Sequence, residues 1–487
     1  MFLQNFIKKN EATKINLYYS LTFSQNNDIA SLQKKEALSK ASVLRQLQNL
    51  INDLEQIGFE FVLDFQEECI FLTPKQQYQI SSVSIVNTLF VHYLNLSSSY
   101  QFIQLFFERK DYALVDISTK LTLSNPYIYQ LIPIINEKIN QFHLTLTIQN
   151  KFVSLVGRES DIFMFRYLMT LALHSLSAHS TSQTIKYHNF SVDEMIQNLQ
   201  LDSDQIQLDE NVYLSCLFDT LIYSDIDSKK IEAEFKDSAI LKLVQQLPVA
   251  KDSSVLRTFI RCCLRIFIPS LDSHSSRTQN GDKLLLSVNL QLVDLAKDMV
   301  QHVTNSFHIQ QLQPNSDLFK QWFYILVIHL YAMDYFQYDF KEVYLHSKDE
   351  ASTQDSVREK VITCYDSFQT DNLVWTAEKK ETYRYTLVNT LYLIIESQSN
   401  TNVSIYLNFN GNIVFEKTLV YKLVSIFNES VLTFTTNSNH ADLIISDYMI
   451  FSTKKDASFF LLDQSDGTKQ FYQLYSLILY LLEKNQR

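Results

Sequence analysis

The chain has 487 residues, of which 46% are hydrophobic and only five are glycine and six proline. This length exceeds what one hydrophobic core organises, so several domains are expected. The scarcity of glycine and proline excludes a collagen-like chain and disfavours a large β-protein, and the formal net charge of −11 is unusual for a protein that binds nucleic acid.

The negative charge is unevenly distributed along the chain. Residues 1–160 contain 14 basic (Lys and Arg) and 14 acidic (Asp and Glu) side chains, whereas the remaining residues contain 28 basic and 39 acidic ones. Because affinity for phosphates follows local positive charge, the acidic total does not exclude DNA binding by the first third of the chain.

The sequence predicts a cytoplasmic protein without a membrane segment. The most apolar run, Trp322–Met333, is shorter than the roughly 18–20 residues that a transmembrane helix needs. The first ten residues do not resemble a signal peptide. The five cysteines lack Cys-x-x-Cys spacing, which fits a reducing compartment.

The familiar motifs of catalysis and cofactor binding are missing from the sequence. There is no P-loop, no dinucleotide-binding glycine motif, no nucleophile elbow and no metal-type spacing of cysteine and histidine. We therefore expect neither an enzyme nor a cofactor or metal site.

Residues 11–73 have the layout of a winged helix-turn-helix. We expect helices at 13–21, 31–38 and 43–54, a turn at 39–42 between the last two, and wing strands at 59–63 and 69–72. The third helix is the predicted recognition helix, since apolar residues from Val43 to Leu54 recur on one face.

The polar face of that helix supplies the main candidates for DNA contact. Arg, Gln and Asn side chains can bond a base edge at two points, and lysines before the helix can hold phosphates. The candidate DNA-binding residues are Lys34, Lys35, Lys40, Ser42, Arg45, Gln46, Gln48 and Asn49.

A second helix-turn-helix is expected between Tyr112 and Glu159, after a linker at Thr73–Lys75 and helices at 82–94 and 100–107. Its predicted parts are helices at 115–121 and 126–139 and strands at 144–148 and 152–156. Ser124 or Asn125 can cap the second helix, and Pro126 suits its first turn.

The second recognition helix is poor in positive charge. It contains no arginine, Lys138 comes only near its end, and Pro133 is expected to kink it. Tyr127, Tyr129 and Gln130 remain candidate DNA contacts, but the first recognition helix with Arg45 carries the stronger prediction.

The run from Leu121 through Leu146, which ends in Leu155–Glu159, resembles the second DNA-binding domain of the Mga/AtxA family of transcriptional regulators. In that family a Gly-x-Glu step closes the domain and leads into a long helix, here from Ile162. The resemblance implies a global transcriptional regulator that binds double-stranded DNA as a homodimer.

The order of the remaining parts also resembles that family. Residues 161–275 and 283–398 read as two helical bundles joined by a linker at 269–282, and they resemble paired domains that regulate through histidine phosphorylation by a phosphotransferase-system phosphocarrier. His188 and His329 are the candidate phosphorylation sites, although the apolar surroundings of His329 in the sequence also fit a core histidine.

Residues 402–487 alternate strands and helices, which predicts a small α/β domain with a parallel sheet. The segment resembles the EIIB-like domain that ends Mga/AtxA proteins. Phosphotransfer by this domain is not expected, because no cysteine follows Cys364, so dimerisation or docking is the expected role.

The sequence thus predicts a mainly α multidomain protein with five parts. Two N-terminal winged helix-turn-helix domains at 1–75 and 76–160 precede two helical PRD-like bundles and a C-terminal α/β EIIB-like domain. Two other hypotheses stay open: an RNA-binding antiterminator under the same phosphotransferase control, and a regulatory scaffold that no longer binds nucleic acid.

Overall fold

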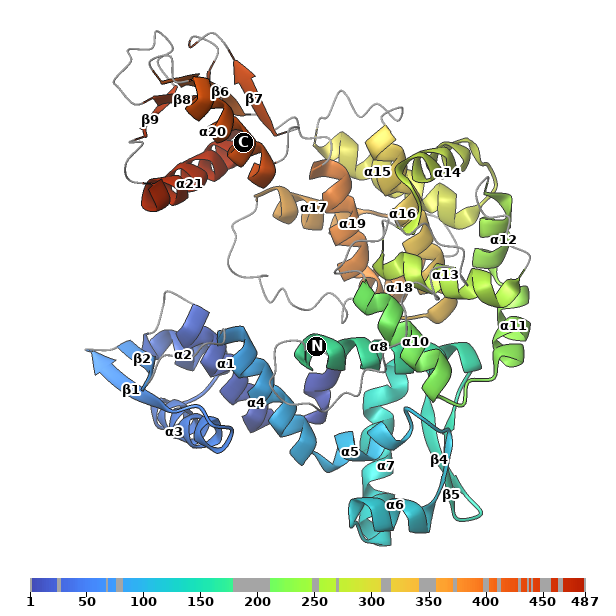
Figure 1. The fold of residues 1–487 in the computed structure, drawn as a ribbon. Coiled ribbons are helices and arrows are strands. Elements are labelled where there is room, and N and C mark those ends of the chain that lie inside the picture. The colour runs from blue at the N-terminus through green and yellow to red at the C-terminus, as the bar shows by residue number, and fades with distance from the viewer. Residues whose placement is uncertain are drawn as a thin grey trace. The chain divides into compact units, whose positions relative to one another are not determined.

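The computed structural model is mainly helical, with a small sheet in its C-terminal part (Figure 1). The chain divides into two compact units, one made of Met1–Val300, Lys320–Thr353 and Gln369–Thr390, the other of Gln301–Phe319, Gln354–Phe368 and Leu391–Arg487. The structure describes residues 2–23, 28–66, 69–75, 82–177, 211–247, 254–268, 271–307, 317–340, 356–370, 375–396, 403–409, 413–427, 431–435, 438, 441–446, 457–462 and 467–485.

The first unit begins with a short helix that was not predicted, η1 (Phe2–Phe6), followed by the three helices and the hairpin that were. These are α1 (Lys9–Phe23), α2 (Ile29–Glu36), α3 (Lys40–Gln56), β1 (Phe61–Gln66) and β2 (Cys69–Pro74). β1 and β2 form an antiparallel pair in which Phe61 lies opposite Pro74. Apolar side chains of α1, α2 and α3 are buried against one another, so the three helices share a core.

Two boundaries in this segment were predicted wrongly. The turn lies at residues 37–39, where Ala37 has a left-handed backbone, and residues 40–42 already belong to α3. The predicted linker at 73–75 is largely strand, because Thr73 and Pro74 complete β2 and the amide of Lys75 donates to the Glu60 carbonyl.

The second helix-turn-helix has all of its predicted parts and one additional strand. The elements are α4 (Ser82–Leu96), α5 (Ser98–Leu105), β3 (Asp111–Ala113), α6 (Leu114–Leu121), α7 (Asn125–Ile139), η2 (Asn140–Phe142), β4 (Thr145–Gln149) and β5 (Phe152–Val156). β5 lies between β3 and β4 in an antiparallel sheet. The sequence did not predict β3, since three residues carry too little periodicity.

Helices continue through the middle of the chain. They are α8 (Glu159–Ser177), α10 (Asn211–Tyr223), α11 (Ser228–Lys236), α12 (Ala239–Gln246), α13 (Val255–Phe267), α14 (His274–Leu286), α15 (Gln291–Ser306), α16 (Asp317–Phe336), α17 (Ser356–Ser367), α18 (Ala377–Thr382) and α19 (Arg384–Glu396). The predicted linker at 269–282 is wrong for its second half, because residues from His274 onward form α14.

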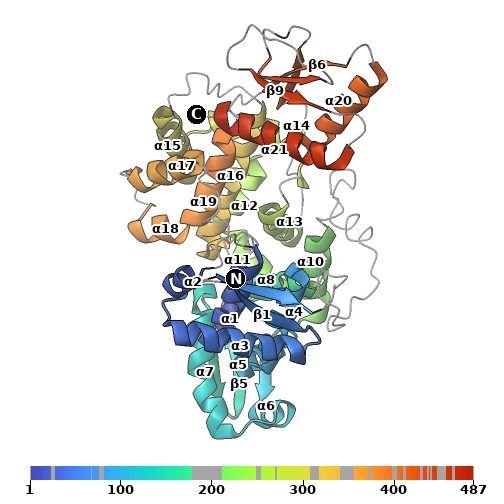
Figure 2. The same cartoon turned by 90° about the vertical axis from the view of Figure 1, so that its left-hand side faces the viewer.

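The C-terminal segment has the predicted alternation of strands and helices. Its elements are β6 (Val403–Asn408), α20 (Ile413–Phe427), β7 (Leu432–Thr435), β8 (Leu443–Ser446), β9 (Ser458–Leu461) and α21 (Gly467–Asn485). The four strands pair in parallel in the order β7-β6-β8-β9. Figure 2 shows α20 and α21 next to the strands of this sheet. Leu419 and Leu423 of α20 and Leu474 and Ile478 of α21 belong to the hydrophobic core that these helices share with the sheet.

None of the helices that the structure describes combines the length and the apolar character needed to cross a membrane.

Candidate nucleic-acid interface

The first helix-turn-helix is shaped by two side-chain caps. Asp28 precedes α2 and accepts hydrogen bonds from the amides of Ala30 (2.7 Å) and Ser31 (3.0 Å). Ser39 precedes α3, and its hydroxyl accepts from the amide of Ser42 at 3.3 Å. Each cap satisfies a helix-end amide that has no partner within the helix, and so each fixes the residue at which its helix begins.

One face of α3 is buried and the opposite face is open. Val43, Leu47, Leu50 and Leu54 are completely buried. Successive helical residues are rotated by about 100°, so the side chains that point away from this core are Arg45, Gln48, Asn49 and Asn52, all of them exposed. The structure therefore brings together the base-reading candidates Arg45, Gln48 and Asn49 on one outward face.

The three lysine candidates differ in whether their ammonium groups already have a partner within the fold. Lys34 and Lys40 are exposed, and within the described part of the chain neither they nor Arg45 form an ion pair. Lys35 is also exposed, but its ammonium donates to the Ser20 hydroxyl at 2.9 Å and so links α2 to α1. Lys34 and Lys40 are thus the better placed to contact phosphates.

Two further candidates lie on the flank of α3 or support its start. The side-chain oxygen of Gln46 is buried and has no hydrogen-bond partner, so this amide does not face outward with its neighbours. The Ser42 hydroxyl accepts a hydrogen bond from Ser39 at 3.0 Å. Gln46 and Ser42 are therefore weaker candidates for DNA contact than Arg45.

A largely buried ion pair, which sequence reasoning missed, joins α3 to α1. Lys14 of α1 pairs with Asp53 of α3, and the Asp53 carboxylate also accepts from the Tyr93 hydroxyl of α4. The Lys14 ammonium lies 4.7 Å from the centre of the Tyr93 ring. Burial and the bond to Asp53 raise the pKa of Tyr93. The cluster therefore joins the first recognition helix to the segment that follows it.

The second recognition helix is capped in the same way as the first. Thr122 has a left-handed backbone, and the Ser124 hydroxyl accepts from the amide of Tyr127 at 3.4 Å. α7 runs as one helix through Pro133, and the kink predicted at this residue stays a prediction. Asn136 exchanges two hydrogen bonds with the backbone of Leu146, which ties α7 to the wing.

The outward face of α7 carries no positive charge. Tyr127 and Tyr129 are 41% and 52% exposed, and Gln130 is exposed beside them. Lys138 is directed elsewhere, because its ammonium lies 5.1 Å from the centre of the Phe6 ring. Burial lowers the pKa of Lys138. The three predicted contacts of α7 are thus accessible, but they are uncharged.

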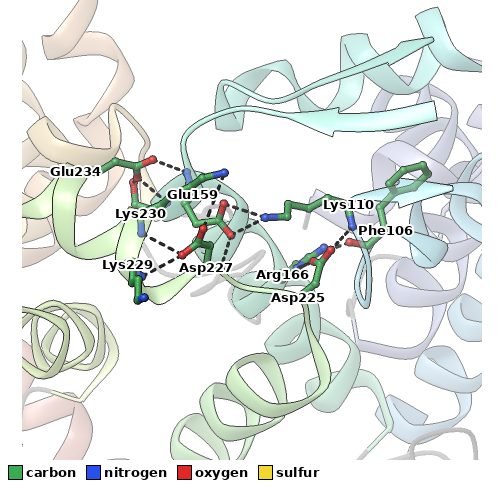
Figure 3. A network of polar contacts seen from close by, with 10 residues as sticks. Phe106, Lys110, Glu159, Arg166, Asp225, Asp227, Lys229, Lys230 and Glu234 are labelled. Carbon is green, nitrogen blue, oxygen red and sulfur yellow. Dashed lines mark hydrogen bonds and ion pairs between the residues drawn. The ribbon is translucent and has the colours of Figure 1, made fainter. Parts of the chain in front are cut away.

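A polar network connects the start of α8 to the segment 225–234 (Figure 3). The buried Arg166 donates to the Phe106 carbonyl at 2.8 Å and to Asp225 at 2.9 Å. Glu159 accepts from the Lys110 ammonium at 3.1 Å and from the amide of Asp227 at 2.8 Å.

Glu234 of α11 completes this network by capping α8. Its carboxylate accepts from the amides of Glu159 (2.8 Å) and Ser160 (2.9 Å) and from the Ser160 hydroxyl (2.7 Å). A carboxylate at a helix N-terminus also interacts favourably with the helix dipole. Side chains of the helical part therefore fix the point at which the helix-turn-helix segment ends.

The two histidine candidates have different outcomes. His329 is 6% exposed, and its ring nitrogens lie 3.2 Å from the Thr390 hydroxyl and 3.4 Å from the Ile266 carbonyl. Burial lowers the pKa of His329 to about 4. Both nitrogens have partners inside the fold, which is the geometry of a core histidine. His188 lies outside the described residues.

Comparison with protein-family models matches residues 82–169 to the Mga helix-turn-helix domain. The matched segment runs from α4 into α8 and includes α7 and the β4–β5 wing. This match confirms the resemblance inferred from the sequence over these residues. No curated protein matches the chain.

Proposed function

Because residues 82–169 form a Mga helix-turn-helix domain, we propose that the chain is a transcriptional regulator that binds double-stranded DNA through two helix-turn-helix segments. The family match carries the proposal. The outward face of α3 supports it, since Arg45, Gln48 and Asn49 are exposed together. Lys34 and Lys40 are exposed as well, and neither forms an ion pair with any residue that the structure describes.

The two segments contribute differently. A bidentate arginine fits the O6 and N7 acceptors of guanine, and an asparagine or glutamine fits adenine, so α3 supplies base readers. Lys34 and Lys40 supply the phosphate contacts that fix the orientation of the helix. The wing from Phe61 to Pro74 contains no lysine or arginine and contributes little to phosphate binding.

The test is a titration of the full chain with duplex DNA over a series of salt concentrations. Arg45→Ala is expected to weaken binding by about 5- to 150-fold, since a good bidentate contact contributes ~1–3 kcal/mol. Lys40→Ala should reduce the slope of log K against log salt by about one. Lys138→Met is the matched control, because its ammonium packs on Phe6.

The outcomes separate the competing readings. An unchanged affinity and salt slope for Arg45→Ala would show that α3 does not read DNA. Failure of the unmodified chain to bind any duplex would favour a regulatory scaffold. Preference for hairpin RNA over duplex DNA in direct competition would favour the RNA-binding antiterminator.

We further propose that the helical bundles regulate DNA binding through histidine phosphorylation and that residues 402–487 support a homodimer. The parallel sheet order β7-β6-β8-β9 supports an EIIB-like segment, and the sequence there lacks a cysteine. His188 is the remaining phosphorylation candidate, because the His329 side chain is buried and a phosphocarrier cannot reach it. Phosphorylation is tested by comparing phosphate transfer from a phosphocarrier to the unmodified chain and to His188→Ala. Dimerisation is tested by sedimentation of a variant that lacks residues 402–487.

A further inference from the structure

A stripe of three uncharged side chains runs along the outward part of α7. Tyr127, Gln130 and Ile134 stand at i, i+3 and i+7, a spacing that places them in one row on a helix. Tyr127 is 41% and Ile134 47% exposed. Ile128 and Ile135, each the next residue along the chain from Tyr127 and Ile134, are completely buried about 100° further around the helix and anchor α7 to the core.

The row formed by Tyr127, Gln130 and Ile134 contains no basic side chain. Lys138, the one basic residue of α7, lies against the Phe6 ring. Glu137 is exposed at the C-terminal end of the helix and repels phosphates there. A guanine-reading contact needs arginine or lysine, so the row cannot recognise guanine in that way.

The row instead matches the chemistry of an A·T base pair in the major groove. A glutamine amide bonds adenine at N6 and N7, and the C5 methyl group of thymine is the apolar feature that aliphatic and aromatic side chains contact. We infer that α7 reads A·T base pairs, with Gln130 on the adenine edge and Tyr127 and Ile134 on thymine methyl groups. The inference rests on the proposed function, and it names adenine and thymine as the bases that α7 contacts.

The inference separates the roles of the two recognition helices. α3 presents Arg45, which suits guanine, together with Gln48 and Asn49. α7 presents no group for guanine and recognises the methyl groups of thymine. Thymine methyl groups that contact Tyr127 or Ile134 are therefore expected in a binding site for the full chain, in addition to the bases that α3 contacts.

The experiment removes single groups from the DNA and from the protein. A tightly bound duplex is first selected by the full chain from random-sequence DNA. It is then resynthesised with uracil in place of thymine, which removes only the methyl groups, or with 7-deazaadenine, which removes only N7. The unmodified chain is expected to lose about four-fold in affinity per contacted methyl group on the uracil duplex.

Variants then locate the source of each loss. Ile134→Ala should bind the thymine duplex about four-fold more weakly than the unmodified chain, and its additional loss on the uracil duplex should be smaller by the same factor. Gln130→Ala should reduce the loss caused by 7-deazaadenine by the part that Gln130 contributes, and Gln48 and Asn49 of α3 account for any remainder. Leu286→Ala is the control, because Leu286 is 81% exposed on α14 outside the matched domain, and it should retain both losses.

Two negative outcomes are distinguishable. If Ile134→Ala, Tyr127→Ala and Gln130→Ala all retain the full losses on the modified duplexes, α7 does not read A·T pairs. The proposed function still stands in that case, provided that the chain binds duplex DNA and Arg45→Ala weakens it. If the unmodified chain binds no duplex, the proposed function itself fails. Circular dichroism of the variants, all changed at exposed positions, checks that they remain folded.

Discussion

Lys14 of α1 and Asp53 of α3 form an ion pair in which the lysine residue is only 7% exposed, on the flank of the helix away from Arg45. Two residues 39 positions apart in the sequence thus set the orientation of the first recognition helix. Because Asp53 also accepts from Tyr93, the pair connects α3 to α4.

Asp53→Ala is expected to destabilise the protein by about 3 kcal/mol, because it leaves the Lys14 ammonium buried without a partner. Urea unfolding measures the loss. Lys14→Met combined with Asp53→Asn should recover much of it, since the amide still accepts from Tyr93. Glu55→Ala, at an exposed position of the same helix, should change stability by no more than about 0.5 kcal/mol.

Gly281→Ala is expected to disrupt the packing of α14 on α16. An added Cβ would lie 2.7 Å from the carbonyl carbon of Lys320 and closer still to its oxygen, so backbone would have to move. We expect a loss of at least about 3 kcal/mol, at the upper end of overpacking effects. Thermal unfolding provides the measurement. Lys283→Ala, at an exposed position of the same helix, should cost much less, and an equal loss would show that Gly281 has no special packing role.

Glu234→Ala should loosen the start of α8 without touching the recognition helices. Two backbone amides, of Glu159 and Ser160, lose their acceptor, and losing a cap costs about 1–2 kcal/mol. Hydrogen exchange at the first turn of α8 should become faster. Glu234→Gln should show a smaller effect because its oxygen still accepts. Glu232→Ala on the same helix serves as the control, and an equal acceleration there would contradict the capping role.

His329 predicts a pH dependence of stability. Its pKa is about 4 in the fold because burial disfavours the charged ring, whereas the unfolded chain binds the proton at the ordinary value of about 6.5. The stabilising contribution of the neutral ring is therefore present above pH 6.5 and is lost as the pH falls from 6.5 towards 4. The protein should be about 2 kcal/mol less stable at pH 5 than at pH 7 from this group alone.

The measurement is urea unfolding at pH 5 and at pH 7, monitored by the fluorescence of Trp322 and Trp375. His329→Gln, which keeps polar atoms near Thr390 but does not titrate, should lose about 2 kcal/mol of that pH dependence. His302→Gln is the control substitution, made at a half-buried histidine whose ring nitrogen lies 3.2 Å from the Ser367 hydroxyl. An unchanged pH dependence in His329→Gln would contradict the assignment.

Local patterns in the sequence were sufficient to predict both helix-turn-helix segments. Ser39 and Ser124 cap the recognition helices, and buried positions such as Leu47 and Ile128 follow the helical period. These features act within a few residues, so they can be read without the fold. The face of α3 that contains Arg45 was predicted for the same reason.

Features that depend on distant neighbours were not predictable. Residues 274–282 include two serines, one asparagine and one glycine and were read as part of a linker, but they belong to α14. Gly281 is where the backbone of α16 approaches closely. The helical period already places Gln46 next to the buried Val43 and Leu50, three and four positions away, so its position on a flank of α3 could have been read from the sequence. The partners of Asp53 and Glu234 come from other elements, which no local pattern reveals.

The position of Phe6 has a consequence for dissecting the chain into fragments. The Phe6 ring packs against Tyr100 and under the Lys138 ammonium, and its carbonyl accepts from the Ser97 hydroxyl. The first turn of the chain thus completes the surface of the second helix-turn-helix. A fragment that starts at residue 76 would expose an apolar patch and release a cation on α7. We expect α7 to bind DNA more tightly in such a fragment than in the full chain, so the fragment would overstate the contribution of this helix.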